Sequence, residues 1–248
     1  MSLLRILSLL FALLPWGAAL AEHLRLAGDS WPPFTDQSLP NNGLAVDLVS
    51  SALQRAGHST EYVEVPWARV LRGLQQGDYD LIVAAWYSAE RTRYGLFSEP
   101  YLVNRIRFLR RAGMPIEYTG LDGLQPFSIA VVRGYSYDGA FDAAEQLTKV
   151  LVLEFAMGAR MLAAGRVQLT LEDELVARHH LNRDLREIRD ALEFVETPLS
   201  ENGLHILVRR SHPLHQQIVR EFNQAIRAMR ADGSYQRIYR RHGLDGGE

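Results

Sequence analysis

The chain has 248 residues, 47% of them hydrophobic, and a formal net charge of −2 at pH 7. Such a chain can bury one large core or two smaller ones, and its nearly balanced charge argues against nucleic acid or an anionic membrane as a partner. It contains no cysteine, which excludes disulfides, thiolate chemistry and a lipid anchor attached to an N-terminal cysteine.

Residues 1–21 have the pattern of a secretory signal peptide. Arg5 forms a short basic region, residues 6–14 form an apolar core, and Ala19-Leu20-Ala21 forms a small-x-small cleavage site. The apolar run is too short, and too interrupted by Pro15, for a membrane-spanning helix of about 20 residues. We therefore expect an exported protein that is cleaved after Ala21.

The first part of the mature chain alternates strands with helices. Trp31-Pro32-Pro33-Phe34 forms a stiff aromatic loop, because both prolines fix φ and disfavour a helix. The apolar spacing predicts, in chain order, a strand at 23–27, a helix at 43–56, a strand at 62–65, a helix at 67–75 and a strand at 81–85. This alternation predicts a mainly parallel sheet that is covered on both faces.

A second alternation follows an extended stretch at 102–110. It predicts strands at 127–132, 150–153 and 168–171, a helix opening near Asp138 and another at 156–164, then a strand at 203–208 and helices at 213–231 and 234–241 that pack back on the first lobe.

We therefore expect two α/β lobes, the first made of residues 22–101 with 202–248 and the second of residues 106–197. Two extended crossovers, 101–105 and 198–202, would join them. Ligands in such sheets bind beyond the carboxyl ends of the strands, so the cleft between the lobes is the expected site.

The segment between Asp78 and Tyr101 carries the clearest chemical signal. A buried strand at 81–85 leads directly into the polar turn Ser88-Ala89-Glu90-Arg91. An arginine just past a buried strand, beside a hydroxyl and free backbone amides, suits the capture of a carboxylate, because its planar fork donates two parallel hydrogen bonds. For Arg91 taken alone, a surface arginine at a charged helix start is the competing interpretation.

Four segments, in this order, resemble the bacterial extracellular solute-binding proteins of the polar amino-acid type, family 3. They are Asp29-Ser30-Trp31-Pro32-Pro33-Phe34, Gly43-Leu44-Ala45-Val46-Asp47-Leu48, Ser88-Ala89-Glu90-Arg91 with Phe97-Ser98-Glu99-Pro100-Tyr101, and Asp232-Gly233-Ser234-Tyr235. The resemblance covers essentially the whole mature chain. It implies an α/β, two-lobed periplasmic binding protein fold (type II), in which two Rossmann-like lobes joined by a two-strand hinge close around a ligand.

The resemblance also implies a function. The protein is expected to be a non-catalytic receptor in the periplasm that captures a small polar ligand bearing a carboxylate, an amino acid or a derivative, for an ABC importer. The expected partners are that small molecule and the inner-membrane permease, with no nucleic acid, cofactor or metal, and the protein is expected to be a monomer.

Site residues carry over by position in the first lobe. Arg91 matches the arginine that grips the ligand's α-carboxylate, and Ser88 stands where a threonine helps to hold it. Trp31 matches an aromatic ring of the pocket wall, and Asp29 lies near the same rim.

In the second lobe, Gly134-Tyr135-Ser136 matches a loop that completes the carboxylate site at a helix N-terminus, where free N–H groups and the helix dipole favour anions. Asp173 matches the acid that pairs with the ligand's α-ammonium. Glu172 precedes it directly, and alternation along a strand lets only one of two neighbours face the cleft. Which of the two does so stays open.

Two positions depart from the family pattern. Trp86 replaces a small residue, so its ring would shrink the pocket or serve as a stacking platform, and Tyr135 replaces a small hydroxyl residue. This aromatic content points to a ligand other than a simple small amino acid. Trp67 is interpreted as a packing residue, with a ligand contact left open because its helix starts near the cleft. His179-His180 lacks a nearby carboxylate at metal-ligand spacing.

Two other functions remain open. Cyclohexadienyl dehydratases resemble the same binding proteins, and a closed cleft with an acid can host a proton-assisted elimination. Against this reading, Val176 stands roughly where those enzymes carry an acidic residue. A periplasmic sensor that signals through a partner is the third hypothesis.

Overall fold

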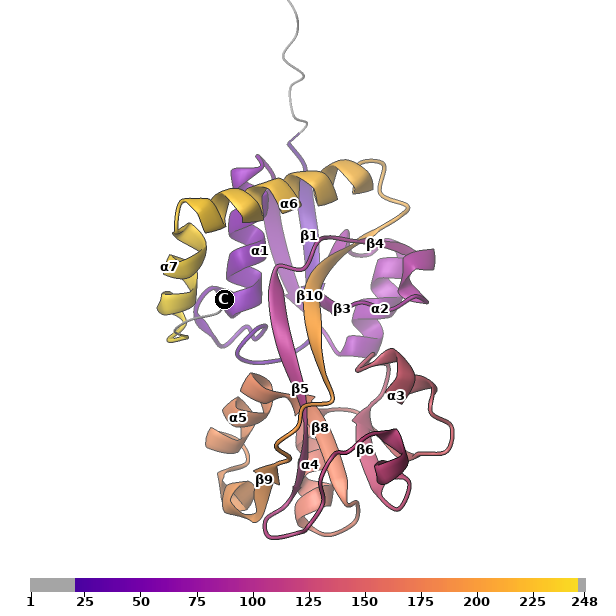
Figure 1. The fold of residues 1–248 in the computed structure, drawn as a ribbon. Helices are drawn as coiled ribbons and strands as arrows, with labels where there is room; N and C mark the ends of the chain where they lie inside the picture. The colour runs from indigo at the N-terminus through magenta and orange to yellow at the C-terminus, as the bar shows by residue number, and fades with distance from the viewer. Residues whose placement is uncertain (1–20, 245–248) are drawn as a thin grey trace, which may run out of the picture.

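The computed structural model of the protein describes residues 21–244, so the predicted signal peptide lies, except for Ala21, outside the described residues. Two long antiparallel strands, β5 (Leu102–Arg111) and β10 (Ser200–Arg209), run between two α/β lobes (Figure 1). They pair with each other from Leu102 opposite Leu204 to Ile106 opposite Ser200. This short ladder includes residues of the stretches 101–105 and 198–202, whose bounds as crossovers stay a prediction.

The upper lobe in Figure 1 is built from both ends of the described chain. It contains β1 (His23–Gly28), α1 (Leu44–Arg55), β2 (Ser59–Glu64), α2 (Trp67–Gln76), β3 (Leu81–Trp86), β4 (Gly95–Phe97), α6 (His215–Ala231) and α7 (Ser234–Arg241), with 3-10 turns η1 (Pro40–Asn42) and η2 (Arg91–Arg93). β1 pairs in parallel with β2 and with β3, and α6 and α7 pack on α1 as predicted.

The lower lobe repeats the strand-helix alternation. It contains β6 (Ser128–Val132), α3 (Gly139–Ala143), β7 (Thr148–Val152), α4 (Phe155–Ala163), β8 (Leu169–Asp173), α5 (Glu174–Asn182) and β9 (Leu192–Phe194), with 3-10 turns η3 (Leu121–Leu124) and η4 (Arg186–Ala191). β6 pairs in parallel with β7 and β8. The lobe boundaries at particular residues stay a prediction.

A single hydrogen-bonded sheet passes through both lobes in the order β2-β1-β3-β10-β5-β8-β6-β7, with β4 on β10 and β9 on β5. The strands β1, β2 and β3 pair in parallel, as do β6, β7 and β8, whereas every pairing that involves β5 or β10 is antiparallel. The predicted mainly parallel sheet is thus correct within the lobes and wrong at the centre, because the two linking strands run in opposite directions.

Alternating side chains along β3 attach helices to both faces of the sheet. Leu81 and Val83 belong to the core that includes α1, whereas Ile82 belongs to the core that includes α2. This is the side-chain alternation expected of a strand buried on both faces. The polar turn after β3 lies at the boundary between the lobes, since Arg91 in this turn donates a hydrogen bond to the carbonyl oxygen of Gly134 in the lower lobe.

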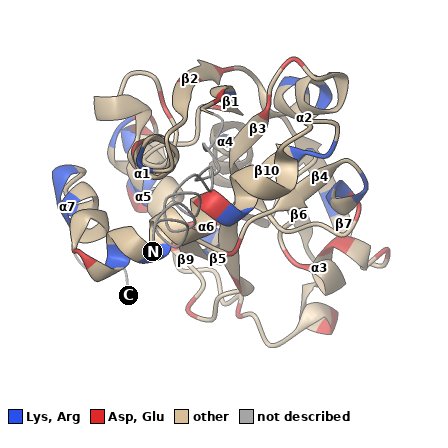
Figure 2. Ribbon diagram, turned by 90° about the horizontal axis from the view of Figure 1, so that it is seen from above, with Lys and Arg blue, Asp and Glu red and all other residues tan. Residues whose placement is uncertain are grey.

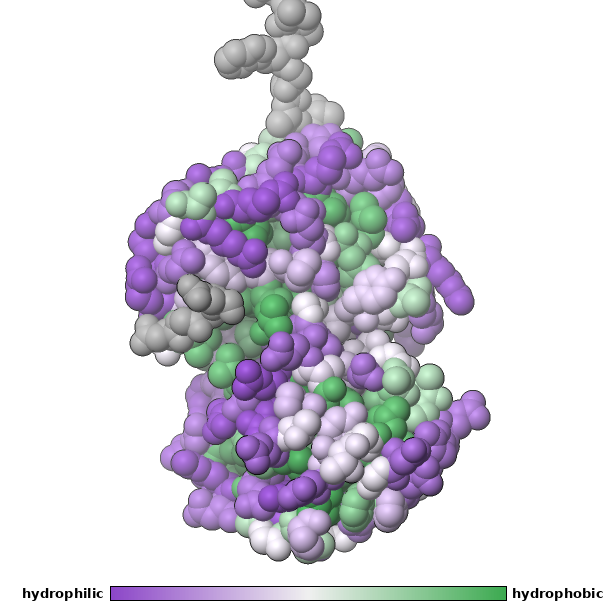
Figure 3. Space-filling view, in the orientation of Figure 1, coloured by the Kyte–Doolittle hydropathy of each residue, from purple (hydrophilic) through white to green (hydrophobic). Residues whose placement is uncertain are grey.

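The outer surface is polar. Basic and acidic residues are spread around both lobes (Figure 2), and hydrophilic residues cover most of the face seen in Figure 3, with hydrophobic residues visible at the narrow waist between the lobes. Within residues 21–244, none of the helices combines the length and the apolar character needed to span a membrane.

Candidate ligand-binding cleft

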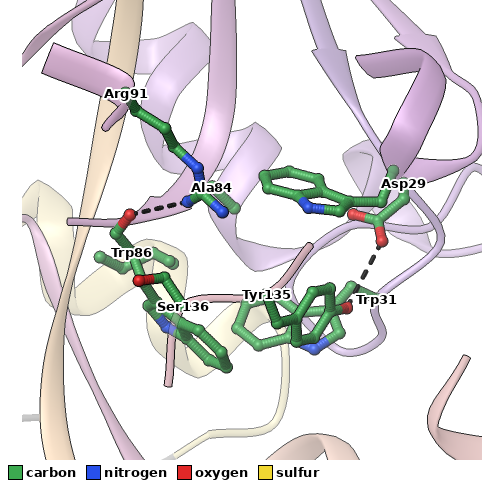
Figure 4. Close-up of a pocket in the computed structure, with 9 residues that line it drawn as sticks. Asp29, Trp31, Ala84, Trp86, Arg91, Tyr135 and Ser136 are labelled. Carbon is green, nitrogen blue, oxygen red and sulfur yellow. Dashed lines mark hydrogen bonds between the residues drawn. The ribbon is translucent and has the colours of Figure 1, made fainter. Parts of the chain in front are cut away.

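A small cavity lies where the two lobes meet (Figure 4). Its lining comes from the upper lobe, the linking strand β10 and the loop after β6. The lining residues are Asp29, Trp31, Trp67, Ala84, Trp86, Arg91, Tyr135, Ser136 and Leu204. The cavity therefore occupies the inter-lobe position that was expected for the site.

Arg91 is a wall of this cavity and not a surface residue. Its side chain is held by the polar turn after β3, and the residue is only 5% exposed. Nη1 donates to the carbonyl oxygen of Trp86 at 2.9 Å and Nη2 to that of Gly134 at 2.7 Å. Burial lowers the pKa of the guanidinium, yet arginine keeps its charge in proteins. The site thus contains a desolvated cation whose planar group is oriented by both lobes.

The Gly134 carbonyl oxygen is bound twice from the opposite lobe. It accepts a hydrogen bond from Trp67 Nε1 at 3.1 Å as well as the one from Arg91. Gly134 has a φ of +80°, a left-handed conformation that favours glycine. A β-carbon there would lie 3.5 Å from the Trp67 ring. The guanidinium of Arg91 also lies over that ring, 5.1 Å from its centroid.

Aromatic rings form most of the remaining wall. Trp86 meets Trp31 with ring centroids 5.5 Å apart at 82°, and meets Tyr135 at 5.4 Å and 84°. Tyr135 also meets Trp67 at 6.0 Å and 83°. Such edge-to-face contacts are favourable for aromatic quadrupoles. Because neighbouring planes are nearly perpendicular, the rings surround the cavity from several directions.

Trp86 is fixed in place from the linking strand. Its Nε1 donates to Oδ1 of the buried Asn104, in β5, at 2.9 Å. A buried indole N–H with a partner sits in one orientation. The bulky ring predicted at this position is therefore a rigid part of the wall.

Asp29 is the acidic group of the cavity. It follows β1, and Tyr135 Oη donates to its Oδ2 at a long 3.5 Å (Figure 4). Burial raises the pKa of Asp29 to about 6, an effect partly offset by its hydrogen bonds. A cation that approaches this carboxyl group lowers its pKa and so increases the fraction that is ionised.

Glu172 and Asp173, at the end of β8, do not line the cavity. Asp173 Oδ1 accepts from the backbone N–H groups of Leu175 at 2.9 Å and Val176 at 3.0 Å, and so caps the start of α5. Glu172 Oε1 accepts from Trp31 Nε1 at 3.2 Å, across the lobe boundary. Of the two neighbours, Glu172 contacts the other lobe. Asp173, the residue expected to bind an ammonium group, instead caps the N-terminus of α5.

Glu172 is fully buried and incompletely satisfied. Besides the Trp31 bond, Oε1 accepts from the backbone N–H of Asp173 at 2.8 Å. Within the described chain, Oε2 has no hydrogen-bond partner. Burial raises the pKa of Glu172 to about 8, so the group is largely protonated at neutral pH.

The model of one protein family matches residues 24–245, almost the whole described chain; its description is bacterial extracellular solute-binding proteins, family 3. The chain belongs to this family. It is 23% identical over 232 residues, 89% of this chain and 91% of the relative, to an arginine-binding periplasmic protein of Mannheimia haemolytica.

Solved structures of similar proteins share the fold of this family 3 chain. One is a histidine kinase sensor domain similar to periplasmic binding proteins, with a TM-score of 0.75, 20% identity, and coverage of 88% of this chain and 95% of the other. Another is an ancestral amino-acid-binding protein described as a precursor of cyclohexadienyl dehydratase, with a TM-score of 0.70, 20% identity, and coverage of 88% and 94%. At this identity the likeness shows the type II periplasmic binding fold alone.

Six of the predicted site residues come together around the cavity: Asp29, Trp31, Trp86, Arg91, Tyr135 and Ser136. Ser88 lies outside it and lines wider grooves that flank the cleft. One of these grooves is also lined by Arg91, Tyr135 and Ser136, so Ser88 and Arg91 share a groove beside the cavity.

The helix N-terminus predicted to hold a carboxylate is capped within the chain. α3 begins at Gly139, and Asp138 Oδ1 accepts from the backbone N–H groups of Ala140 at 3.0 Å and Phe141 at 2.9 Å. Ser136 Oγ donates to Asp142 Oδ2 at 3.3 Å. Two amides at the start of α3 are therefore bound within the chain, whereas the predicted carboxylate-binding role of the loop Gly134-Tyr135-Ser136 stays a prediction. Arg91 is the main anion-attracting group of the cavity.

Three lining residues were not among the predicted site residues: Trp67, Ala84 and Leu204. Trp67 was interpreted as packing, and it does pack with Val70 and Leu74, but it also contacts Arg91 and Gly134. Its position at the start of a helix, after the carboxyl end of β2, was the available signal. Ala84 and Leu204 are apolar strand residues that carried none. Within residues 21–244, His, Asp and Glu residues form no metal-binding group of three or more.

Proposed function

We propose that the protein is a periplasmic solute-binding protein. It captures a small ligand bearing a carboxylate, an amino acid or a derivative, in the inter-lobe cavity and delivers it to an ABC importer of the inner membrane. The observation that carries the proposal is Arg91, a buried guanidinium in the cavity wall with hydrogen-bond partners on both lobes. Family membership supports it, as does the arginine-binding periplasmic relative.

Capture would follow from electrostatics in a closed cleft. A carboxylate that meets Arg91 makes charge-assisted hydrogen bonds, which are shorter and stronger than neutral ones. Exclusion of water by the surrounding rings strengthens them further. Export by the predicted signal peptide, cleavage after Ala21 and a monomeric state complete the proposal.

The proposal is tested by ligand-induced stabilisation of the mature protein across a panel of amino acids and their derivatives. A ligand at about a hundredfold excess over its Kd should stabilise the fold by about 2.7 kcal/mol. Arg91→Ala should abolish this stabilisation, since it removes the cation that binds the carboxylate. Arg93→Ala, an exposed arginine of the same η2 turn, should retain it. An unchanged affinity in Arg91→Ala would refute the carboxylate assignment.

Glu172 favours a second candidate function, a dehydratase-like enzyme. A buried carboxyl group with a pKa of about 8 is a proton donor at neutral pH, and it touches the cleft through Trp31. Turnover of prephenate, lost in Glu172→Gln, would establish the enzyme. Stabilisation by ligands without turnover would leave the receptor function standing.

A further inference from the structure

The two ends of the cavity differ in chemistry. Figure 4 shows Arg91 and Ser136 on one side and the Asp29 carboxylate with the Tyr135 hydroxyl on the other. The Arg91 side suits the ligand carboxylate, because it presents a buried guanidinium. The Asp29 side therefore receives whatever group the ligand carries at its other end.

That second side offers negative charge but few hydrogen-bond acceptors. The two acids at the end of β8 do not line the cavity. Asp173 caps α5, and Glu172 Oε1 accepts from Trp31 and from the backbone, while its Oε2 has no partner within the described chain. Asp29 is the carboxylate that lines the cavity. A primary ammonium has three N–H donors, and each donor left without an acceptor in a buried site is unfavourable.

Aromatic rings occupy the positions where those acceptors would be needed. Trp31, Trp86 and Tyr135 line the cavity and meet one another at nearly perpendicular angles. Ring faces attract cations through their quadrupoles, and cages of rings recognise quaternary ammonium groups. The cavity already contains one such contact, because the Arg91 guanidinium lies over the Trp67 ring.

We propose that the ligand's second end is an alkylated cation without N–H groups, so that the site takes betaine-type compounds, carboxylates that carry a quaternary ammonium. This inference rests on the proposed function and narrows its ligand class. The carboxylate binds at Arg91, the methyl groups pack against Trp31, Trp86 and Tyr135, and Asp29 balances the positive charge without donating or requiring a hydrogen bond.

The test is a methylation series on one carboxylate: glycine, N-methylglycine, N,N-dimethylglycine and glycine betaine, with arginine as the amino acid named by the relative. Isothermal titration of the mature protein should show affinity rising along the series, with glycine betaine at least tenfold tighter than glycine and tighter than arginine. Choline, which has the quaternary ammonium but no carboxylate, should bind more weakly than glycine betaine.

Variants of Tyr135 and Asp29 test which side chains cause the preference for glycine betaine. Tyr135→Leu removes a ring and should reduce the preference for glycine betaine over glycine, whereas Tyr135→Phe retains the ring, loses only the hydroxyl and should preserve it. Asp29→Asn should weaken glycine betaine severalfold. The methylation series in the unaltered protein decides the matter even if a variant fails to fold.

Each outcome separates the inference from the proposed function. If glycine or arginine binds as tightly as glycine betaine, or more tightly, the inference is overturned while the receptor function stands. If none of the carboxylates binds, the proposed function fails and the inference fails with it.

Discussion

Glu172 shows how one side chain ties the two lobes together. It is contributed by β8 of the lower lobe, yet its Oε1 accepts from the indole of Trp31 in the upper lobe. Both residues are buried. Desolvation at this boundary raises the pKa of the carboxyl group to about 8, since a charged carboxylate without a paired cation is unfavourable there.

This shift predicts a pH-dependent stability. Below the ordinary glutamate pKa of about 4.3, the carboxyl group is protonated in both the folded and the unfolded chain. As the pH rises from there towards about 8, the unfolded chain releases the proton while the folded chain retains it, so the free energy of unfolding falls. Glu172→Gln, which is neutral at every pH, should remove this part of the slope and be more stable than the parent at pH 8 by roughly 2–4 kcal/mol.

Urea unfolding of both proteins at a series of pH values measures the difference. Comparison with the parent cancels the titration of all other groups. Stability profiles that run parallel between pH 4 and 9 would show that Glu172 is already ionised in the folded protein.

Arg91 and the aromatic wall differ in how well the sequence predicted them. The polar turn after β3 placed Arg91 at the lobe boundary, because a strand end and a turn are local features. The contacts of Trp67 with Arg91 and Gly134 depend on how the lobes meet, and no local pattern contains that information. The engagement of Asp173 by α5 is different, because an aspartate directly before a helix is a local N-cap signal.

At the scale of elements, the start of α5 depends on a single acceptor. Asp173 Oδ1 binds two of the N–H groups that a helix leaves unsatisfied at its first turn. Asp173→Ala should therefore lower the free energy of unfolding by about 1–2 kcal/mol, and Asp173→Asn, which keeps an acceptor, should restore most of it. Urea titration provides the measurement. A loss of ligand affinity in Asp173→Ala at unchanged stability would instead assign this acid to the ligand.

The periodic helices were predictable, whereas the three-residue strands were not. The helices expected at 43–56 and 67–75 appear as α1 (Leu44–Arg55) and α2 (Trp67–Gln76). β4 and β9 span three residues each, too few for a two-residue period to be visible. Both pair with β10 or β5, so their formation depends on the linking strands and not on their own sequence.

The whole molecule is two lobes on one continuous sheet, and the linking ladder of β5 and β10 is its narrowest part. A hinge there would change the distance between lobes while leaving each lobe intact. The absence of cysteine allows two dyes to be attached at introduced cysteines without background labelling.

Energy transfer between the lobes is expected to respond to ligand. With dyes at Arg72→Cys in α2 and Glu145→Cys in the lower lobe, both exposed positions, transfer efficiency should increase when a bound ligand favours the closed form. The matched control pairs Arg72→Cys with Arg220→Cys, an exposed position of α6 in the same lobe, and should stay constant. Equal changes in both pairs would exclude a hinge between the lobes.

The Gly134 carbonyl has a consequence for selectivity. Its oxygen lies between the donors of Arg91 and Trp67, in the kind of position that one oxygen of a bound carboxylate would take. A solute oxygen that replaces the carbonyl there therefore contributes to binding only the difference in hydrogen-bond strength between itself and a peptide oxygen. Neutral amides and hydroxyls differ little from a peptide carbonyl, whereas a carboxylate forms hydrogen bonds roughly twice as strong. Under the proposed function, the backbone would act as a built-in reference acceptor, and the cleft would favour solutes that are more strongly negative than its own main chain.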